Sequence, residues 1–335
     1  MKLISKINTA RMVKHISNDE FYYVNKDKQL VKYLNSKTEN IISNIKCEVI
    51  EEWNSGLLIN ECIFYNYSTF EPLFEENNIY KCLVISNDKL IIKKNDFINE
   101  KIKFGVYNHK NNLILWIELN KNINPYFFNS NNTFISYTKL GLENYDLNLN
   151  LLWRHTFSSL LNEDEVVTSD EIVEVSDVIY FVLHGGGKHD CFALDANTGK
   201  VVKTYPDLVG QLIVEDETIY FLHTEIISIL NTKTDEITTW FIDDLMKEKG
   251  VDSLLFPRWA VYDGLIYFSQ SKGADRYSDN IGARFGVLDP IKKEMLWQHQ
   301  LPLENGIIGE IKVNQNRIYL HTQDQTLFIF KRKDE

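Results

Sequence analysis

The sequence that most suggests chemistry is residues 184–190, HGGGKHD. Three consecutive glycines could let backbone N–H groups approach a phosphate, with Lys188 as the counter-charge. A phosphate-binding loop normally opens a helix, however, whereas apolar strand-like segments come both before and after this one. We therefore interpret residues 184–190 as a tight hairpin turn and expect no cofactor there.

The histidines, cysteines and carboxylates show no spacing typical of a metal or catalytic centre. His184, His189 and Asp190 are close in sequence, but they share one turn, and no HxH or HExxH spacing occurs. The four cysteines are scattered, and no Gly-x-Ser-x-Gly motif occurs. Among the 47 acidic residues, a carboxylate pair for glycoside hydrolysis stays possible, although no pair stands out. We predict no catalytic residue, no metal and no cofactor.

Three other segments suit contact with a partner. Residues 271–284 (SKGADRYSDNIGAR) form an insertion expected on an exposed loop, and Pro257 leads into an Arg-Trp pair of the kind enriched at interfaces. The third segment is an acidic run. Each segment has an alternative explanation. The insertion could have no function, the tryptophan could pack in the core, and the acidic run could be a solvated loop. The residues predicted to contact a partner are Arg258, Trp259, Asp275, Arg276, Tyr277, Asp279, Glu163, Asp164 and Glu165.

A repeat in the second half of the chain must position these residues. Each copy reads as an apolar strand, a short polar turn and a second apolar strand, and its valine is followed five or six residues later by a tyrosine. The period-2 alternation of apolar residues and the polar turns predict β-hairpins. The copies are Val175 with Tyr180, Val214 with Tyr220, Val261 with Tyr267, and Val313 with Tyr319.

A third strand in each copy ends in Asp or Asn, and a fourth strand carries an aromatic residue. The Asp or Asn can accept hydrogen bonds from the backbone just after it, and glycine tolerates the positive φ of such a turn. The aromatic residue can then cover the neighbouring sheet. The clearest of these residues are Asp146 with Trp153, Asp195 with Gly199, Asn231 with Trp240, and Asp289 with Trp297.

The spacing of these turns predicts the architecture. Positions 108, 146, 195, 231 and 289 are 36 to 58 residues apart, which is the period of a four-stranded propeller blade. We predict an all-β fold in which residues 1–335 form a single β-propeller; we favour seven blades, with six or eight as alternatives. Because the last apolar strand, residues 326–331, has no fourth strand after it, we expect an N-terminal segment to pair there and close the ring. Only residues 242–249 are expected to be helical.

Residues 179–205, with LDANTGK at their centre, resemble the repeat of the quinoprotein-like (PQQ-like) β-propeller superfamily. The resemblance implies that the Asp, Thr-Gly and Trp residues dock neighbouring blades. In that superfamily a quinone belongs to a dehydrogenase subset that uses adjacent cysteines and a carboxylate-bound calcium, and that is exported. Because this chain has no Cys-Cys pair and no secretory signal, we do not extend the resemblance to the cofactor or the activity.

Composition and charge narrow the function. The sequence is 44% hydrophobic, which is enough to form a core. The net charge of −11 disfavours binding to nucleic acid or to anionic lipid and favours a basic partner. Solubility alone would also explain this charge. No apolar run approaches the length of a membrane span. We expect a cytoplasmic, non-catalytic, protein-binding propeller.

The chain is similar in these properties to cytosolic immunity proteins of bacterial toxin–immunity pairs, some of which are propellers that cover a basic nuclease toxin. The resemblance implies that acidic and aromatic loop residues block a cationic cleft. The alternatives are a propeller hydrolase or lyase acting on a carbohydrate or small molecule at the central channel mouth, and a scaffold in a larger assembly.

Overall fold

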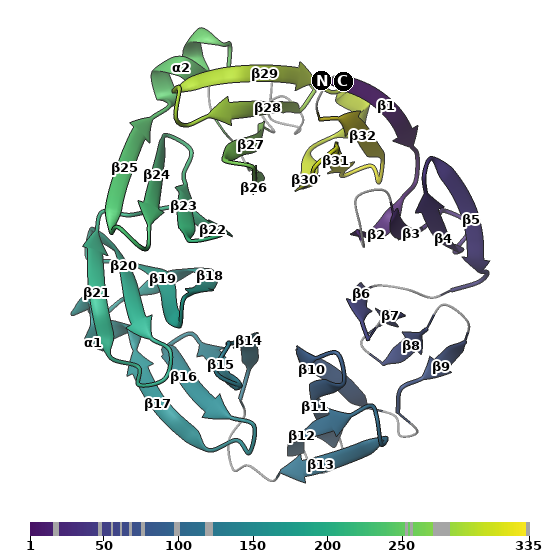
Figure 1. The fold of residues 1–335 in the computed structure, drawn as a ribbon, viewed down its shortest axis with the longest axis vertical. Coiled ribbons are helices and arrows are strands. Elements are labelled where there is room, and N and C mark those ends of the chain that lie inside the picture. The colour runs from purple at the N-terminus through teal and green to yellow at the C-terminus, as the bar shows by residue number, and fades with distance from the viewer. Residues whose placement is uncertain are drawn as a thin grey trace. The chain divides into compact units, whose positions relative to one another are not determined.

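The fold consists of four-stranded antiparallel sheets, seen in a computed structural model that describes residues 1–15, 20–45, 49–54, 56–60, 62–66, 69–74, 78–96, 101–117, 123–251, 254, 257–270 and 282–332. These residues form eight such sheets (Figure 1). Seven of them contain four consecutive strands in chain order. This arrangement is that of β-propeller blades, so the predicted all-β propeller of four-stranded blades is confirmed. We number the blades 1 to 8 along the chain.

The chain divides into two compact units, and we describe each by itself. The first comprises Met1–Ile45 with Leu208–Glu335 and contains blades 1, 6, 7 and 8. Its strands are β2 (Arg11–His15), β3 (Glu20–Val24), β4 (Leu30–Leu34) and β5 (Lys37–Ile42) in blade 1; β22 (Gln211–Glu215), β23 (Thr218–Leu222), β24 (Ile226–Asn231) and β25 (Glu236–Phe241) in blade 6; β26 (Trp259–Tyr262), β27 (Leu265–Gln270), β28 (Arg284–Asp289) and β29 (Glu294–Gln300) in blade 7; and β30 (Ile308–Val313), β31 (Arg317–Thr322), β32 (Leu327–Lys331) and β1 (Lys2–Ile7) in blade 8.

The second unit, Lys46–Asp207, contains blades 2 to 5. Its strands are β6 (Ile50–Trp53), β7 (Gly56–Ile59), β8 (Ile63–Tyr65) and β9 (Phe70–Pro72) in blade 2; β10 (Ile79–Ser86), β11 (Lys89–Asp96), β12 (Lys101–Asn108) and β13 (Leu113–Ile117) in blade 3; β14 (Pro125–Phe128), β15 (Thr133–Thr138), β16 (Gly141–Asp146) and β17 (Leu151–Thr156) in blade 4; and β18 (Val167–Val175), β19 (Val178–Gly185), β20 (Lys188–Asp195) and β21 (Val201–Pro206) in blade 5.

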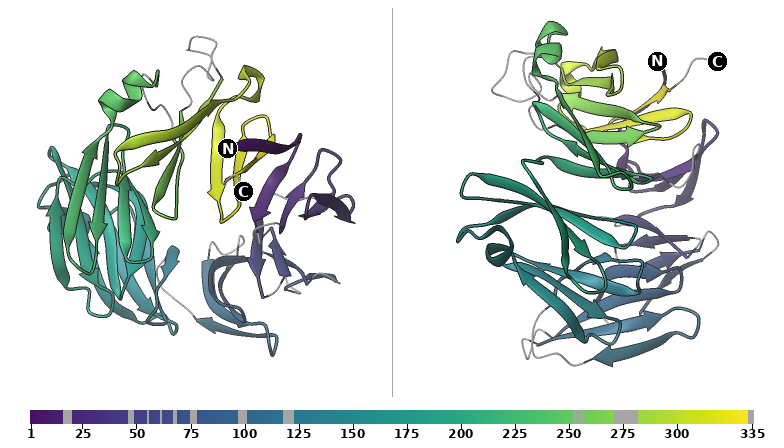
Figure 2. Two further views of the ribbon diagram at one scale, coloured as in Figure 1. Left: turned by 45° about the horizontal axis from the view of Figure 1, so that its top comes forward. Right: turned by 60° about the vertical axis from the view of Figure 1, so that its left-hand side comes forward.

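The N-terminal segment supplies the fourth strand of blade 8. β1 pairs antiparallel with β32, from Lys2 opposite Lys331 to Ile7 opposite Leu327, and the two strands lie side by side in Figures 1 and 2. Blade 8 is therefore built from both ends of the chain, and truncation at either end would remove strand pairing from it.

The described residues contain eight blades rather than the seven we favoured. The additional sheet is blade 2, at residues 50–72, well before the first predicted turn at position 108. Its strands are only three or four residues long, and they carry no valine–tyrosine pair. Trp53, on its first strand, instead donates a hydrogen bond to the Ser86 carbonyl of blade 3 at 2.9 Å.

Two helices lie in the described chain. The helix expected at residues 242–249 is α2 (Asp243–Glu248), and a short 3₁₀ turn, η1 (Leu303–Asn305), lies further on. A second helix, α1 (Phe157–Leu161), was not expected from the sequence; its Phe157 and Leu161 are one turn apart and both buried. Too few residues take part for a helical period to be visible in the sequence.

The predicted turn residues accept backbone hydrogen bonds as expected. The Asp195 carboxylate accepts hydrogen bonds from the Thr198 hydroxyl at 2.8 Å and its backbone N–H at 2.7 Å, which lower the pKa of Asp195. Asn231 and Asp289 each accept two backbone N–H groups in the same way. Asp146 accepts from the backbone of Asn148 and of Asn150.

Trp153 shows how a fourth-strand aromatic residue docks one blade on the next. Its indole N–H donates to the Ala196 carbonyl at 3.0 Å, and the Asn144 amide donates to the same oxygen at 3.1 Å. Gly199, at φ +71°, lies against the indole ring, where an added Cβ would be 2.7 Å from the ring carbons. Trp240 is likewise buried, between blades 6 and 7, and Trp297 contacts Phe330 of blade 8 edge-on.

We predict that Gly199→Ala destabilises the protein by about 2–4 kcal/mol, because the methyl group would both strain the positive φ and overlap Trp153. Gly187→Ala is the matched control, since Gly187 has φ +80° and nothing within 4 Å of its added Cβ. It should cost only about 1 kcal/mol. Urea unfolding of both variants measures the difference. Equal losses would show that contact with Trp153 does not constrain this turn.

The repeated tyrosines predict a loss of stability in alkali. Burial, followed by nearby groups that include Glu215, raises the pKa of Tyr220 to about 12, and burial followed by Tyr205 and Cys191 raises that of Tyr180 to about 12. Between pH 10 and 12 these hydroxyls ionise in the unfolded chain but stay protonated in the folded one. Stability present below pH 10 is therefore lost as the pH rises through this window.

Thermal melts between pH 9 and 12, with ultraviolet titration of the tyrosines, test this expectation. Tyr180→Phe and Tyr220→Phe remove the titrating hydroxyls, so their melting temperatures should fall less steeply than that of the unmodified chain. If all three proteins lose stability in parallel, these two tyrosines are not the cause.

Candidate functional site

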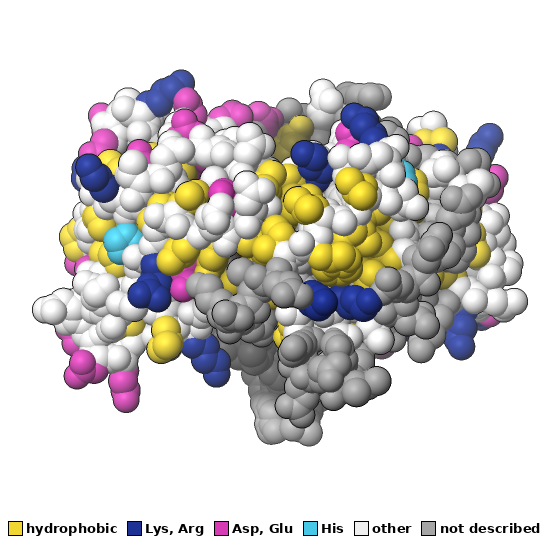
Figure 3. All heavy atoms as spheres, turned by 90° about the horizontal axis from the view of Figure 1, so that it is seen from below, with side chains coloured by type: hydrophobic (Ala, Val, Ile, Leu, Met, Phe, Trp, Pro, Cys, Tyr) yellow, Lys and Arg dark blue, Asp and Glu magenta, His cyan; other side chains and the backbone are white. Residues whose placement is uncertain are grey.

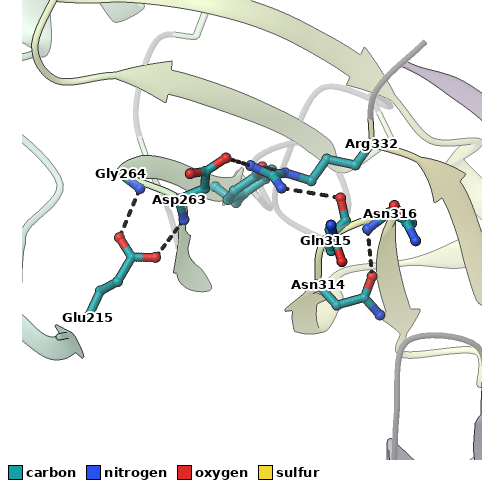
Figure 4. A network of polar contacts seen from close by, with 8 residues as sticks. Glu215, Asp263, Gly264, Asn314, Gln315, Asn316 and Arg332 are labelled. Atoms are coloured by element: carbon teal, nitrogen blue, oxygen red, sulfur yellow. Dashed lines mark hydrogen bonds and ion pairs between the residues drawn. The ribbon is translucent and has the colours of Figure 1, made fainter. Parts of the chain in front are cut away.

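Three hairpin turns of blades 6, 7 and 8 meet in the first unit. They connect β22 to β23, β26 to β27, and β30 to β31, and Figure 4 shows their polar groups facing one another. Asp263 and Gly264, with φ of 57° and 70°, form the two-residue turn that their Asp-Gly sequence predicts. The turns thus bring together residues that are far apart along the chain.

Glu215 joins the turn of blade 6 to that of blade 7. Its carboxylate accepts hydrogen bonds from the backbone N–H groups of Asp263 and Gly264, at 2.5 and 2.8 Å (Figure 4). Charge-assisted hydrogen bonds of this kind are stronger than those between neutral groups. Glu215 therefore holds the Asp-Gly turn in place from the neighbouring blade.

Arg332 joins blade 8 to blade 7, and only 2% of its side chain is exposed. Its guanidinium donates to the Tyr267 hydroxyl at 2.8 Å, to the Asp263 carboxylate at 2.8 Å and to the Gln315 carbonyl at 3.2 Å. The guanidinium carbon also lies 4.4 Å from the centre of the Tyr262 ring, within range of a cation–π interaction. Arg332 therefore fixes the orientation of both Asp263 and Tyr262.

An open cavity of about 520 Å³ lies over this network. Three carboxylates and one guanidinium line it, so its formal charge is −2. Asp216 and Asp263 are exposed, whereas Arg332 is held beneath them. The chemistry that fits is recognition of a cationic side chain by carboxylates beside an aromatic ring. The lining residues are Glu215, Asp216, Tyr262, Asp263, Gly264, Gln315 and Arg332.

The central residue of this site, Arg332, has no signal in the sequence. The turn residues Asp263 and Gly264 were recognised as a hairpin signal, but Arg332 follows the last strand between two lysines and has no distinguishing motif. Its role depends on Tyr267 and Asp263, which precede it by 65 and 69 residues. No local pattern could have indicated that contact.

Arg258 and Trp259 have structural roles in the described chain. Arg258 Nε donates to the Gly309 carbonyl of blade 8 at 2.8 Å, and its backbone N–H donates to the Ser269 hydroxyl. Trp259 is 7% exposed and packs in the core between blades 6 and 7. Apolar packing covers the Trp259 ring, as the alternative of core packing expects, and contact of this residue with a partner stays a prediction.

The other predicted contact residues divide into two groups. Asp275, Arg276, Tyr277 and Asp279 lie outside the described residues. In the acidic run, Glu163 forms an ion pair with Lys188 at 2.6 Å, while Asp164 and Glu165 are exposed. The structure thus brings the acidic run against the HGGGKHD turn, two segments that the sequence analysis treated separately.

Residues 184–190 form a hairpin turn, as interpreted. β19 and β20 are joined through Gly186 and Gly187, which both have positive φ, and His184 pairs directly with His189. The Nδ1 atoms of these two histidines are 2.8 Å apart. The described residues contain no cluster of three or more His, Cys, Asp or Glu side chains suited to hold a metal.

The buried thiol of Cys191 fits a structural role. Burial raises its pKa, so the reactive thiolate is disfavoured.

Within the described part of the chain, no helix has the length and apolar character that crossing a membrane requires.

No protein-family model and no curated protein matches this chain. Among solved structures, the computationally designed protein Ika8 has 11% sequence identity over 98% of both chains and a TM-score of 0.58. BamB from Moraxella catarrhalis has 11% identity over 99% of this chain and 98% of its own, with a TM-score of 0.44. The WD40 β-propeller domain of Doa1 has 12% identity over 100% and 96%, with a TM-score of 0.48. At such identities the likeness concerns the fold alone.

We predict that Arg332→Met destabilises the protein by about 2–4 kcal/mol, because it leaves the buried Tyr267 hydroxyl and the Gln315 carbonyl without their donor. Asp263→Asn is the control. The Asp263 side chain is 58% exposed, so losing its charge should cost less than about 1 kcal/mol. Chemical denaturation compares the two, and an equal effect would mean that the ion pair rather than the buried hydrogen bonds stabilises this site.

Proposed function

We propose that this chain is a non-catalytic propeller that binds a basic protein through the turn surface of blades 6, 7 and 8, meaning residues 215–217, 262–264 and 314–316. The observation that carries the proposal is the open cavity, where exposed carboxylates and Tyr262 surround an arginine whose hydrogen bonds are directed to its own chain. A lysine or arginine of a partner would meet carboxylates that are already oriented.

The charge of the whole chain supports the same kind of partner. A net charge of −11 attracts a basic protein and speeds its association. Glu215 and Arg332 hold the Asp263-Gly264 turn in place before any partner binds. This preformed turn would lower the entropic cost of ordering the surface on binding.

The more specific proposal is a cytosolic immunity protein that covers the cationic cleft of a nuclease-type toxin domain. Such a cleft binds nucleic-acid phosphates through lysines and arginines, the side chains that fit this cavity. Blocking would then require no chemistry from the propeller, only coverage of the cleft by an acidic surface.

Affinity capture from native lysate of the source cells tests the proposal. The unmodified chain should recover a basic protein, and Asp216→Lys should reduce its recovery about tenfold or more, because Asp216 is exposed in the cavity. Asp244→Lys is the control, since Asp244 is also exposed but lies on α2.

The captured protein also tests the specific proposal. Adding the unmodified chain should abolish a nuclease activity of that protein, and Asp216→Lys should restore it. Recovery of no basic protein would contradict the proposed binding function. Recovery of a basic partner without nuclease activity would contradict the immunity role alone.

A further inference from the structure

The fourth strand of blade 3, β13, is an unusual edge strand. Its sequence, LILWI, is entirely apolar, and it is the last strand of its sheet, with no strand on its other edge among the described residues. The other seven fourth strands, β1, β5, β9, β17, β21, β25 and β29, each contain a charged residue. Charged residues protect an edge strand from pairing with other chains, and β13 lacks that protection.

The two sides of β13 differ in exposure, although Ile117, on the side of Leu113 and Leu115, also packs against a core cluster. Ile114 and Trp116 pack against the core that joins blades 2 and 3. Leu113 and Leu115 point to the opposite side, where they are 58% and 56% exposed. Figure 3 views the molecule from the side on which β12 and β13 lie, and hydrophobic side chains gather on this face with Lys and Arg side chains beside them.

Blade 3 is basic in an acidic protein. Residues 78–117 contain seven lysines, two aspartates and one glutamate, a formal charge of +4 in a chain whose total is −11. Lys81 forms an ion pair with Glu51 of blade 2, and Lys110 forms one with Asp88. Blade 3 therefore carries a formal excess of positive charge, and Figure 3 shows Lys and Arg side chains beside the hydrophobic ones on this face.

We propose that β13 is a docking edge for an extended segment of another protein in which apolar residues alternate with carboxylates. The segment adds to blade 3 as a fifth strand. Its backbone pairs with the open edge of β13, its apolar side chains cover Leu113 and Leu115, and its carboxylates meet the lysines of the blade. This site differs from the turn surface of blades 6, 7 and 8 in position and in the charge of its partner.

The charge of blade 3 decides between two possible occupants. A second copy of this chain could pair β13 with β13, but that would place two blades of formal charge +4 side by side. Like charges across such a contact are unfavourable, whereas an acidic segment neutralises them. The observations therefore favour an acidic partner over self-association.

Fluorescence anisotropy with a short labelled peptide of alternating glutamate and valine tests the docking edge. The full chain should bind this peptide, more weakly at high salt, and should not bind the same peptide with lysine in place of glutamate. Hydrogen exchange should slow at residues 113–117 when the glutamate peptide is added, because strand pairing protects backbone amides. Protection elsewhere, or equal binding of the lysine peptide, would overturn the proposal.

Leu115→Glu should raise the Kd of the glutamate peptide about tenfold or more, through lost apolar contact and like-charge repulsion. Val202→Glu is the matched control: Val202 is 60% exposed on β21 of the same unit, and its replacement should leave the Kd unchanged. Equal effects of the two variants, or no binding by the unmodified chain, would contradict the proposal. So would a dimer in sedimentation that Leu115→Glu dissociates, because a second copy would then be the occupant.

Discussion

Each four-stranded sheet of this chain carries apolar side chains on both faces, and both faces have to be covered. Strand β27 shows the constraint directly. Ile266 and Phe268 point into the core shared with blade 6, while Tyr267, between them, points into the core shared with blade 8. A single strand thus supplies two cores through its period of two. No blade can bury its surface alone, so the stability of each blade depends on its neighbours.

This constraint separates the residues that hold blades together from those left available for function. The repeated tyrosines and tryptophans are committed to packing or to contacts between blades, as Trp153 is through the Ala196 carbonyl. Turns and fourth strands are less constrained, because packing covers them only in part. Both proposed surfaces use these positions: the acidic turns of blades 6, 7 and 8, and the edge of β13.

The packing repeat could be predicted from the sequence, because its determinants are local. Asp195 and its turn lie within a few residues, and the spacing of such turns predicted four-stranded blades. Blade 2 was hidden because its short strands dock through Trp53, on the first strand rather than the fourth. The acidic site could not be predicted, since Arg332 contacts residues more than sixty positions earlier. Trp259 resembled an interface residue because composition alone does not distinguish an exposed tryptophan from a buried one.

Hydrogen exchange of the chain in complex with its captured basic partner tests the central claim most directly, that the turns of blades 6, 7 and 8 form the binding surface. The account predicts slower exchange at residues 215–217 and 262–264 in the complex, with residues 113–117 unchanged, because the two surfaces serve partners of opposite charge. Protection confined to other parts of the chain, with these turns exchanging as fast as in the free protein, would contradict it.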